Sequence, residues 1–320
     1  MRSHRKSGHA YTAWVSLTRR LDGEGQATHL IGIFNDITRS KEAEQKLLRQ
    51  AHFDALTDLP NRHLLEDRLR VALDTLAAHP NVGPFIGRQL IQRLVTSNPS
   101  PAYVGRVAAA YANNGMGVRG DLASVVRAIL LDVEARDPAA LGQPGFGKLR
   151  EPVLRFLNWA RAFGAASPAD AWAIGDLSDP ATKLGQSPLR APSVFNFFRP
   201  GYVPPNSALA TQGLVAPEFQ IATESSVAGY VNYMQRAIAG NGIGDVRVSY
   251  TGLTALAADS SALLAEVNLV LAAGQLSAAT LATLKAALDT ITATTDAGKL
   301  NRVQAALLLV MAAPEYIVQK

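Results

Sequence analysis

The sequence predicts a mainly α-helical protein. We expect a helical C-terminal domain with a long ordered loop, preceded by a small N-terminal β-hairpin and a connecting helix. Three observations support this. Strand-like alternation is confined to the first 38 residues, and apolar residues recur at helical spacing in several later segments. Between Leu184 and Ile221, six prolines exclude a long helix or a central strand, while Phe195, Phe198 and other aromatic residues favour an ordered loop.

The N-terminal elements come first. Residues 11–17 alternate, with Tyr11 and Leu17 on one face, which predicts a strand. A turn at 22–25 and a second strand over about 27–35 would complete a hairpin. A polar helix follows from residue 39, in which Ala43, Leu47 and Ala51 lie at helical spacing.

Capping residues mark the helices of the C-terminal part. Pro101 and Pro152 suit the first turn of a helix, and Asp121 suits an N-cap. Ser225 or Ser226 is expected to begin a further helix. The predicted helices cover 85–95, 101–112, 121–131, 152–163 and 225–239. The Ala- and Leu-rich tail from 253 to 320 should form three or four antiparallel helices, with breaks near Gly274 and Gly298. Met116, Met234 and Met311 are expected to fill the core.

Composition excludes several classes of function. The 31 basic and 26 acidic residues are spread along the chain, so the net charge of +5 predicts no nucleic-acid interface. There is no cysteine, and all six histidines lie in the first 80 residues. The larger part therefore has no Ser-His-Asp triad or His-ligated metal site, and we expect no catalytic residues and no cofactor. The start lacks a signal-peptide pattern and the longest apolar run, 305–313, is too short for a membrane span, so the chain as written is expected to be cytoplasmic.

Two glycine patterns resemble nucleotide-binding motifs. Gly142, Gly147 and Lys148 match G-x-x-x-x-G-K, but Leu149 stands where Ser or Thr is needed. A G-x-G-x-x-G pattern starts at Gly115, but a helix end precedes it rather than a strand. We interpret both as turns.

The proline-rich loop contains the candidate binding residues Arg190, Asn196, Arg199 and Glu218. Polar groups among aromatic rings can line a small-molecule or carboxylate site. The alternative, which we favour, is that both arginines stack on the rings and hydrogen-bond to loop carbonyls. Glu224 is an acid close to Glu218 in sequence, which leaves a carboxylate-based hydrolase as a further hypothesis.

From residue 79 to 320 the sequence resembles the C-terminal part of the bacterial domain of unknown function 1800 family. The segments HPNVGPFIGRQLIQRLV, LGQSPLRAPSVFNFFRPGYVPP, LVAPEFQIATESSVAGY and LLLVMAAPEYIVQK carry the resemblance. It implies a largely helical fold and relatives that are longer, exported proteins.

The preceding residues resemble two bacterial signalling modules. Residues 1–38 resemble the C-terminal hairpin of a PAS domain. Residues 39–78 resemble a signalling helix and the start of a GGDEF diguanylate cyclase domain, through the phrase DALTDLPNR at 54–62. The chain has no Gly-Gly pair, so cyclic dinucleotide synthesis is excluded. The two resemblances meet inside a helix without a linker, which suggests a fused or chimeric chain.

These observations lead to three hypotheses. The first is a non-catalytic helical domain, 79–320, with a binding or structural role and an unknown small-molecule ligand. The second is a signal-transduction protein in which the N-terminal helix forms a homodimer that regulates the C-terminal domain. The third is the carboxylate-based hydrolase.

Overall fold

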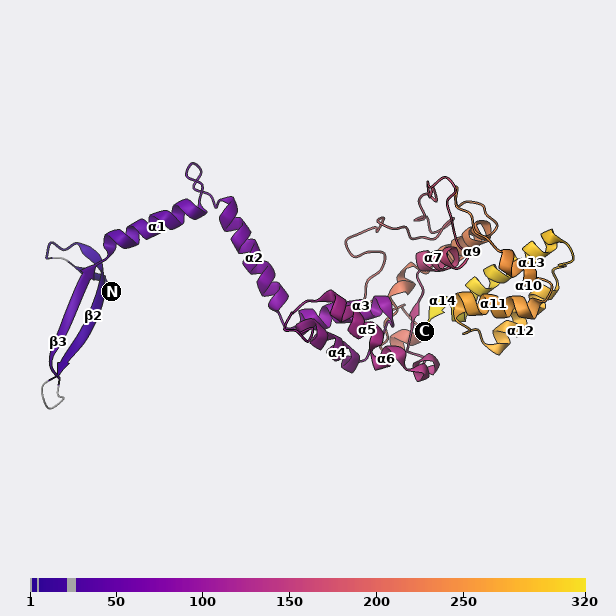
Figure 1. The fold of residues 1–320 in the computed structure, drawn as a ribbon, viewed down its shortest axis with the longest axis horizontal. Coiled ribbons are helices and arrows are strands. Elements are labelled where there is room, and N and C mark those ends of the chain that lie inside the picture. The colour runs from indigo at the N-terminus through magenta and orange to yellow at the C-terminus, as the bar shows by residue number, and fades with distance from the viewer. Residues whose placement is uncertain (1, 5, 22–26) are drawn as a thin grey trace. The chain divides into compact units, whose positions relative to one another are not determined.

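The computed structural model describes residues 2–4, 6–21 and 27–320, so the turn expected at 22–25 lies outside the described residues. The fold is mainly helical, with a small N-terminal hairpin, as the sequence predicts (Figure 1). The chain divides into two compact units, Met1–Val82 and Gly83–Lys320.

The N-terminal unit begins with an antiparallel sheet of strands β1 (Arg2–His4), β2 (Ala10–Leu21) and β3 (Ala27–Asp36), in that order. Strands β2 and β3 form the expected hairpin, with Val15 opposite Phe34. Strand β1 was not predicted, because three residues are too few to show an alternating pattern.

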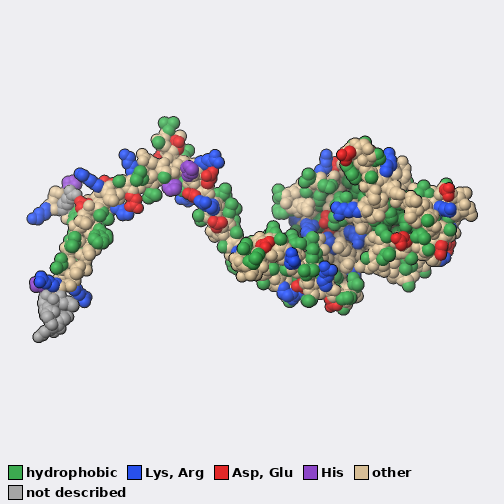
Figure 2. Space-filling model, viewed as in Figure 1, with side chains coloured by type: hydrophobic (Ala, Val, Ile, Leu, Met, Phe, Trp, Pro, Cys, Tyr) green, Lys and Arg blue, Asp and Glu red, His purple; other side chains and the backbone are tan. Residues whose placement is uncertain are grey.

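Two helices complete this unit, α1 (Thr38–His52) and α2 (Arg62–Ala78). Asn61 organises the turn between them. Its side chain accepts a hydrogen bond from the Leu64 amide at 3.1 Å and donates one to the Ala51 carbonyl at 2.8 Å. Neither helix has a buried residue. Most leucines of α1 and α2 therefore face solvent, and green side chains lie along both helices in Figure 2.

The C-terminal unit opens with short helices. Those at Pro101 and Leu122 begin within one residue of the predicted starts, whereas the first begins at Val82, three residues before the predicted start. Four of them carry an N-cap side chain: Ser100, Asp121, Asp132 and Asp137 accept hydrogen bonds from backbone amides of the following turn. The elements are α3 (Val82–Leu94), α4 (Pro101–Ala112), α5 (Leu122–Leu131), α6 (Val133–Arg136) and the 3₁₀ helix η1 (Pro138–Gly142).

The main core lies between α7 and the helices of the second half of the unit. Trp159, Tyr233, Met234 and Met311 are fully buried there, and the Trp159 indole donates a hydrogen bond to the Tyr250 hydroxyl at 3.1 Å. The helices are α7 (Pro152–Ala162), α9 (Glu224–Ile238), α10 (Thr251–Leu256), α11 (Ser260–Ala272), α12 (Ala278–Asp289), α13 (Asp296–Ala312) and α14 (Pro314–Ile317).

Three sequence predictions need correction here. Helix α9 starts before the two serines, because Thr223 is its N-cap and Ser226 completes a capping box. The second break of the tail lies at residues 290–295, just before Gly298 and not at it. Gly298 lies in the first turn of α13, where its amide donates to the Thr295 hydroxyl. Met116 is exposed in a turn after α4 rather than buried, whereas Met234 and Met311 do fill the core.

The proline-rich loop is ordered but contains two short helices, α8 (Ala208–Thr211) and η2 (Pro217–Ile221). Phe198 anchors this loop, because its ring is buried and lies beneath the Arg93 guanidinium. The distance from the guanidinium carbon to the ring centroid is 4.2 Å. Asn98 and Val215 exchange two further hydrogen bonds, of 2.9 and 3.0 Å. Phe195, by contrast, is exposed. The loop is thus held by one buried ring and by polar contacts to its backbone.

A two-stranded sheet joins distant parts of the unit. Strand β4 (Lys148–Leu149) pairs antiparallel with β5 (Val318–Gln319). Gly147 precedes β4 with φ of +106°, and a Cβ there would lie 2.6 Å from the Gln319 carbonyl oxygen. Only glycine allows the backbone at residue 147 to come this close to Gln319 without a backbone shift. Among the described residues, no helix has the length and apolar character that a membrane crossing requires.

Candidate functional site

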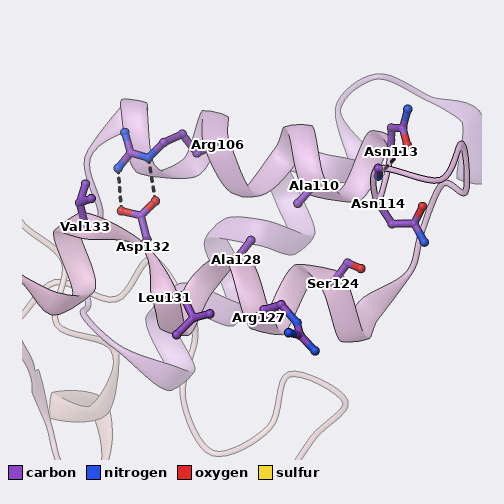
Figure 3. Close-up of a pocket in the computed structure, with 11 residues that line it drawn as sticks. Arg106, Ala110, Asn113, Asn114, Ser124, Arg127, Ala128, Leu131, Asp132 and Val133 are labelled. Atoms are coloured by element: carbon purple, nitrogen blue, oxygen red, sulfur yellow. Dashed lines mark hydrogen bonds and ion pairs between the residues drawn. The ribbon is translucent and has the colours of Figure 1, made fainter.

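A groove of about 630 Å³ lies along α4 and α5 in the C-terminal unit (Figure 3). Asn113 and Asn114 lie at one end, and Arg106 and Asp132 at the other. The amide oxygen of Asn113 already accepts hydrogen bonds from the amides of Gly115 and Gly117, both at 2.9 Å. These side chains shape the turn that follows α4.

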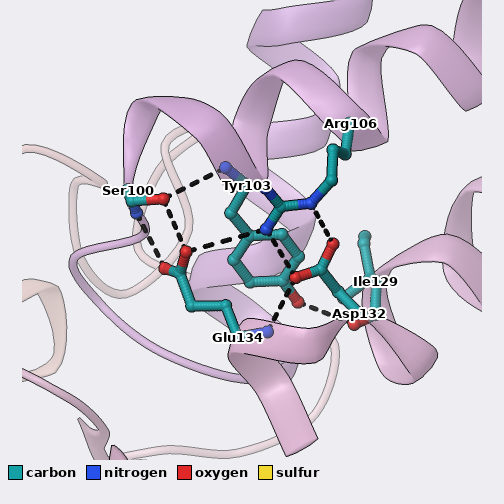
Figure 4. A network of polar contacts seen from close by, with 6 residues as sticks. All are labelled: Ser100, Tyr103, Arg106, Ile129, Asp132 and Glu134. Carbon is teal, nitrogen blue, oxygen red and sulfur yellow. Dashed lines mark hydrogen bonds and ion pairs between the residues drawn. The ribbon is translucent and has the colours of Figure 1, made fainter. Parts of the chain in front are cut away.

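The polar groups next to this groove form a network that ties helix ends together (Figure 4). The Glu134 carboxylate accepts hydrogen bonds from the Ser100 amide at 3.0 Å and the Ser100 hydroxyl at 2.5 Å. The Tyr103 hydroxyl donates to the Ile129 carbonyl at 2.7 Å, and Arg106 binds Asp132. Because these groups satisfy one another, we assign the network a structural role.

A second hollow has a different character. This cavity, of about 370 Å³, lies between β4, η2, the start of α7, the start of α9 and the segment from Ala312 to Val318. Glu218 and Arg155 are the charged residues of its lining, and we call it the Glu218 cavity. Most of the wall is apolar, and includes Leu149, Phe219, Ile221, Val227, Val231 and Ile317. An apolar concavity with few polar groups is the usual form of a small-molecule site.

Arg155 supplies a buried positive charge to the cavity wall. Only 7% of the residue is exposed. Its Nε donates to the Arg150 carbonyl at 2.7 Å, and its guanidinium lies 4.8 Å from the centroid of the Tyr230 ring. None of the ion pairs between described residues includes Arg155. Burial lowers the pKa of this guanidinium, yet an arginine stays charged at neutral pH, so the charge has no carboxylate to balance it.

Glu218 lies in η2 and is almost completely buried. Its Oε2 atom has no hydrogen-bond partner among the described residues. Burial raises the pKa of the carboxyl group, against the smaller opposing effect of the Lys148 charge. Glu218 therefore holds a buried polar atom without a partner in the wall of a mainly apolar cavity.

The charges behind the cavity are mostly positive. The buried Lys148 ammonium donates to the Arg93 carbonyl at 2.6 Å, and burial lowers its pKa. The Arg93 guanidinium lies 3.8 Å from the Glu151 carboxylate. Arg150 places its guanidinium 4.5 Å from the Tyr316 ring centroid, and its Nη1 atom is buried without a hydrogen-bond partner. With Arg155 these cations outnumber the two carboxylates, Glu151 and Glu218.

The four residues that the sequence suggested as a binding site each have their own surroundings. Arg190 forms an ion pair with Asp176, at 3.0 Å, on the surface. The Arg199 guanidinium lies 6.0 Å from the Phe195 ring centroid, so stacking on a ring holds for this arginine. Asn196 is exposed in the left-handed region, with φ of 68°. No hydrogen bond or ion pair found between described residues joins any of them to Glu218.

Sequence reasoning missed Arg155, Lys148 and Tyr230. A signal for Arg155 is present, since it lies four residues before Trp159 and next to Phe156 on the buried face of α7. A charged residue on an apolar helical face is unusual and indicates either a buried pair or a site. Lys148 ends the G-x-x-x-x-G-K pattern, but its ammonium binds a backbone carbonyl. The residues that the structure describes contain no cluster of three or more His, Cys, Asp or Glu side chains fit for a metal.

One protein family matches the chain. The model of the family described as "Protein of unknown function (DUF1800)" matches residues 25–318, well beyond the segment 79–320 in which the sequence resemblance was noted. The match extends into the PAS-like and GGDEF-like residues and gives no support to those two resemblances. No curated protein and no solved structure matches the chain. Since the family match covers nearly the whole sequence, the chain belongs to the DUF1800 family.

Proposed function

We propose that the C-terminal unit is a binding module for a small, mainly apolar molecule that occupies the Glu218 cavity. The observation that carries this proposal is the pairing of an apolar wall with two buried, unbalanced polar groups. Arg155 has no ion-pair partner and Glu218 Oε2 no hydrogen-bond partner among the described residues. A buried charge without a counter-ion is costly, and so is a buried carboxyl oxygen without a partner. A ligand with an acidic group would supply the counter-ion.

Binding is better supported than hydrolysis. A carboxylate-based hydrolase needs two acids on either side of one reacting bond. Glu218 is buried, whereas Glu224 is exposed in the first turn of α9. No contact found between described residues brings Glu224 to the cavity, and it is not part of the lining. The geometry therefore gives the hydrolase hypothesis no support.

The neutral fluorophore 1-aminoanthracene provides a direct test. Its emission should rise on addition of the full chain, because an apolar ring system enters the cavity. Ala222→Trp and Ala312→Trp place a large ring in the cavity lining at exposed positions, so they should abolish the signal without unfolding the protein. Ala228→Trp, exposed on α9 and outside the lining, is the matched control. Equal binding by all four proteins would overturn the proposal.

A second candidate function concerns the N-terminal unit. The sequence resemblance to signalling modules at 1–38 and 39–78 suggests a homodimer that regulates the domain from residue 79 onward. Exposed leucines support this, because α1 and α2 bury no residue within their own unit. Leu65, Leu69 and Leu76, each more than half exposed, lie along α2 with the spacing of a coiled-coil stripe.

The dimer hypothesis is tested by mass. Light scattering of the full chain should give twice the mass of one chain. The variant Leu69→Glu/Leu76→Glu should give a monomer, because it places charges in the apolar stripe. Glu66→Lys, on the same helix but outside the stripe, serves as the control. A monomer at every concentration of the unaltered chain would rule out this candidate.

A further inference from the structure

We infer that the Glu218 cavity takes an amphiphile with a carboxylate head bound at Arg155 and an unbranched apolar chain. This inference rests on the proposed binding function and specifies its ligand. Arg155 is the cationic side chain of the lining, and its planar guanidinium can donate two parallel hydrogen bonds to a carboxylate. A neutral molecule would leave that charge buried without a counter-ion.

The distribution of charge around the cavity favours an anion over a cation. Arg155, Arg150 and Lys148 lie within one short stretch of β4 and α7, and all three side chains are wholly or largely buried. Their nearest acid in sequence, Glu151, already binds Gln186 and lies 3.8 Å from Arg93. A ligand carboxylate would supply the missing negative charge.

Glu218 does not oppose this assignment. Burial raises the pKa of its carboxyl group. A carboxyl group that keeps its proton can donate one hydrogen bond. Its Oε2 atom is buried without a hydrogen-bond partner among the described residues, and no ion pair found between these residues joins Glu218 to Arg155. An ionised Glu218 would instead favour a ligand with an amine head. A preference for an amine over a carboxylate is therefore the outcome that would contradict the inference.

The size of the cavity suits a ligand with one apolar tail. Its volume of about 370 Å³ lies in the range of small-molecule sites, about 300–1,000 Å³. Decanoate, with about twelve non-hydrogen atoms, is a single-tailed carboxylate of suitable size.

The test compares three ligands of equal length by displacement of 1-aminoanthracene from the full chain. Decanoate should bind about tenfold or more tightly than 1-decanol, the difference expected when one charge-assisted contact is gained. Decylamine should bind most weakly. Equal affinities for decanoate and 1-decanol, or preference for decylamine, would overturn the inference but leave the binding function standing. Failure of 1-aminoanthracene itself to bind would count against the binding function.

Variants then locate the head group. Arg155→Met keeps the length of the side chain and should lose the preference for decanoate over 1-decanol while still binding 1-aminoanthracene. Arg190→Met makes the same change of charge at an exposed site and should leave the preference intact. If Arg155→Met fails to fold, the comparison of the three ligands on the unaltered protein still shows whether the cavity prefers a carboxylate. Retention of the preference by a folded Arg155→Met would refute the assignment to Arg155.

Discussion

Arg106 on α4 donates two hydrogen bonds to the Asp132 carboxylate, one to each oxygen and both of 2.7 Å (Figure 4). Asp132 also accepts from the Glu134 amide at 2.9 Å and so serves as the N-cap of α6. One buried carboxylate thus joins α4 to the junction of α5 and α6. The pairing with Arg106 is the main cause of the lowered pKa of Asp132.

The lowered pKa of Asp132 predicts in which direction the stability of the fold changes with pH. A carboxyl group with a lower pKa in the folded state than in the unfolded state stabilises the fold above the unfolded value of about 3.9. That contribution shrinks as the pH falls below this value and is lost as the pH falls through the lower pKa of the folded state. Arg106→Met should lower the melting temperature by a few degrees at pH 7 and by less at pH 3, as measured by circular dichroism. An equal loss at both pH values would show that Arg106 acts through packing alone.

Glu218 gives the opposite dependence on pH. Burial raises its pKa in the folded state, so the fold is favoured below the unfolded value of about 4.3 and loses stability as the pH rises from there. The charges that act on it are Lys148, Arg93 and Glu151. Glu218→Gln should therefore raise the melting temperature at pH 8 and leave it nearly unchanged at pH 4. The exposed Glu224→Gln should have little effect at either pH, and a Glu218→Gln effect independent of pH would contradict the assignment.

Gly229 lies where α9 passes the backbone of Pro180 and Ala181. A Cβ at this position would stand 2.9 Å from the Ala181 carbonyl carbon and closer still to the Pro180 oxygen. Gly229→Ala should destabilise the protein by about 1–3 kcal/mol, because the clash with backbone exceeds the gain in helix propensity. Gly105→Ala is the control: it lies in α4 with open space around it and should stabilise by up to about 1 kcal/mol. Urea denaturation of both variants gives the comparison.

The two phenylalanines of the proline-rich loop should differ in their contribution to stability. Phe198 is buried under Arg93, so Phe198→Ala should cost about 3 kcal/mol and speed proteolysis of the loop. Phe195 is 65% exposed, and Phe195→Ala should cost less than about 0.5 kcal/mol. Similar losses from both changes would mean that the loop is held as an aromatic cluster, not by one ring.

The helix starts of the C-terminal unit could be predicted because their signals are local. Pro101, Asp121 and Pro152 act on the backbone of their own first turn, and each helix begins within a residue of the predicted start. The start of α9 was less certain, since Thr223, Ser225 and Ser226 are all possible caps. The structure selects Thr223 through the reciprocal bond with Ser226.

The candidate site could not be predicted in the same way. Glu218 was among the expected binding residues, but its neighbours were not, because the cavity unites residues from Leu149 to Val318. The position of Arg155 against the Tyr230 ring depends on the packing of α7 on α9. Sequence reasoning instead grouped Glu218 with Arg190 and Arg199, which are near in the chain but bind other partners. Proximity along an irregular loop is weak evidence of proximity in space.

The pairing of β4 with β5 has a consequence for folding kinetics. Lys148 and Gln319, which pair directly, are about 170 positions apart, so the wall of the Glu218 cavity closes only when a very long loop does. Contacts of such sequence separation form late and slowly. A ligand of the cavity should therefore bind only chains that have passed the folding transition state. It should slow unfolding in proportion to its occupancy and leave the refolding rate unchanged.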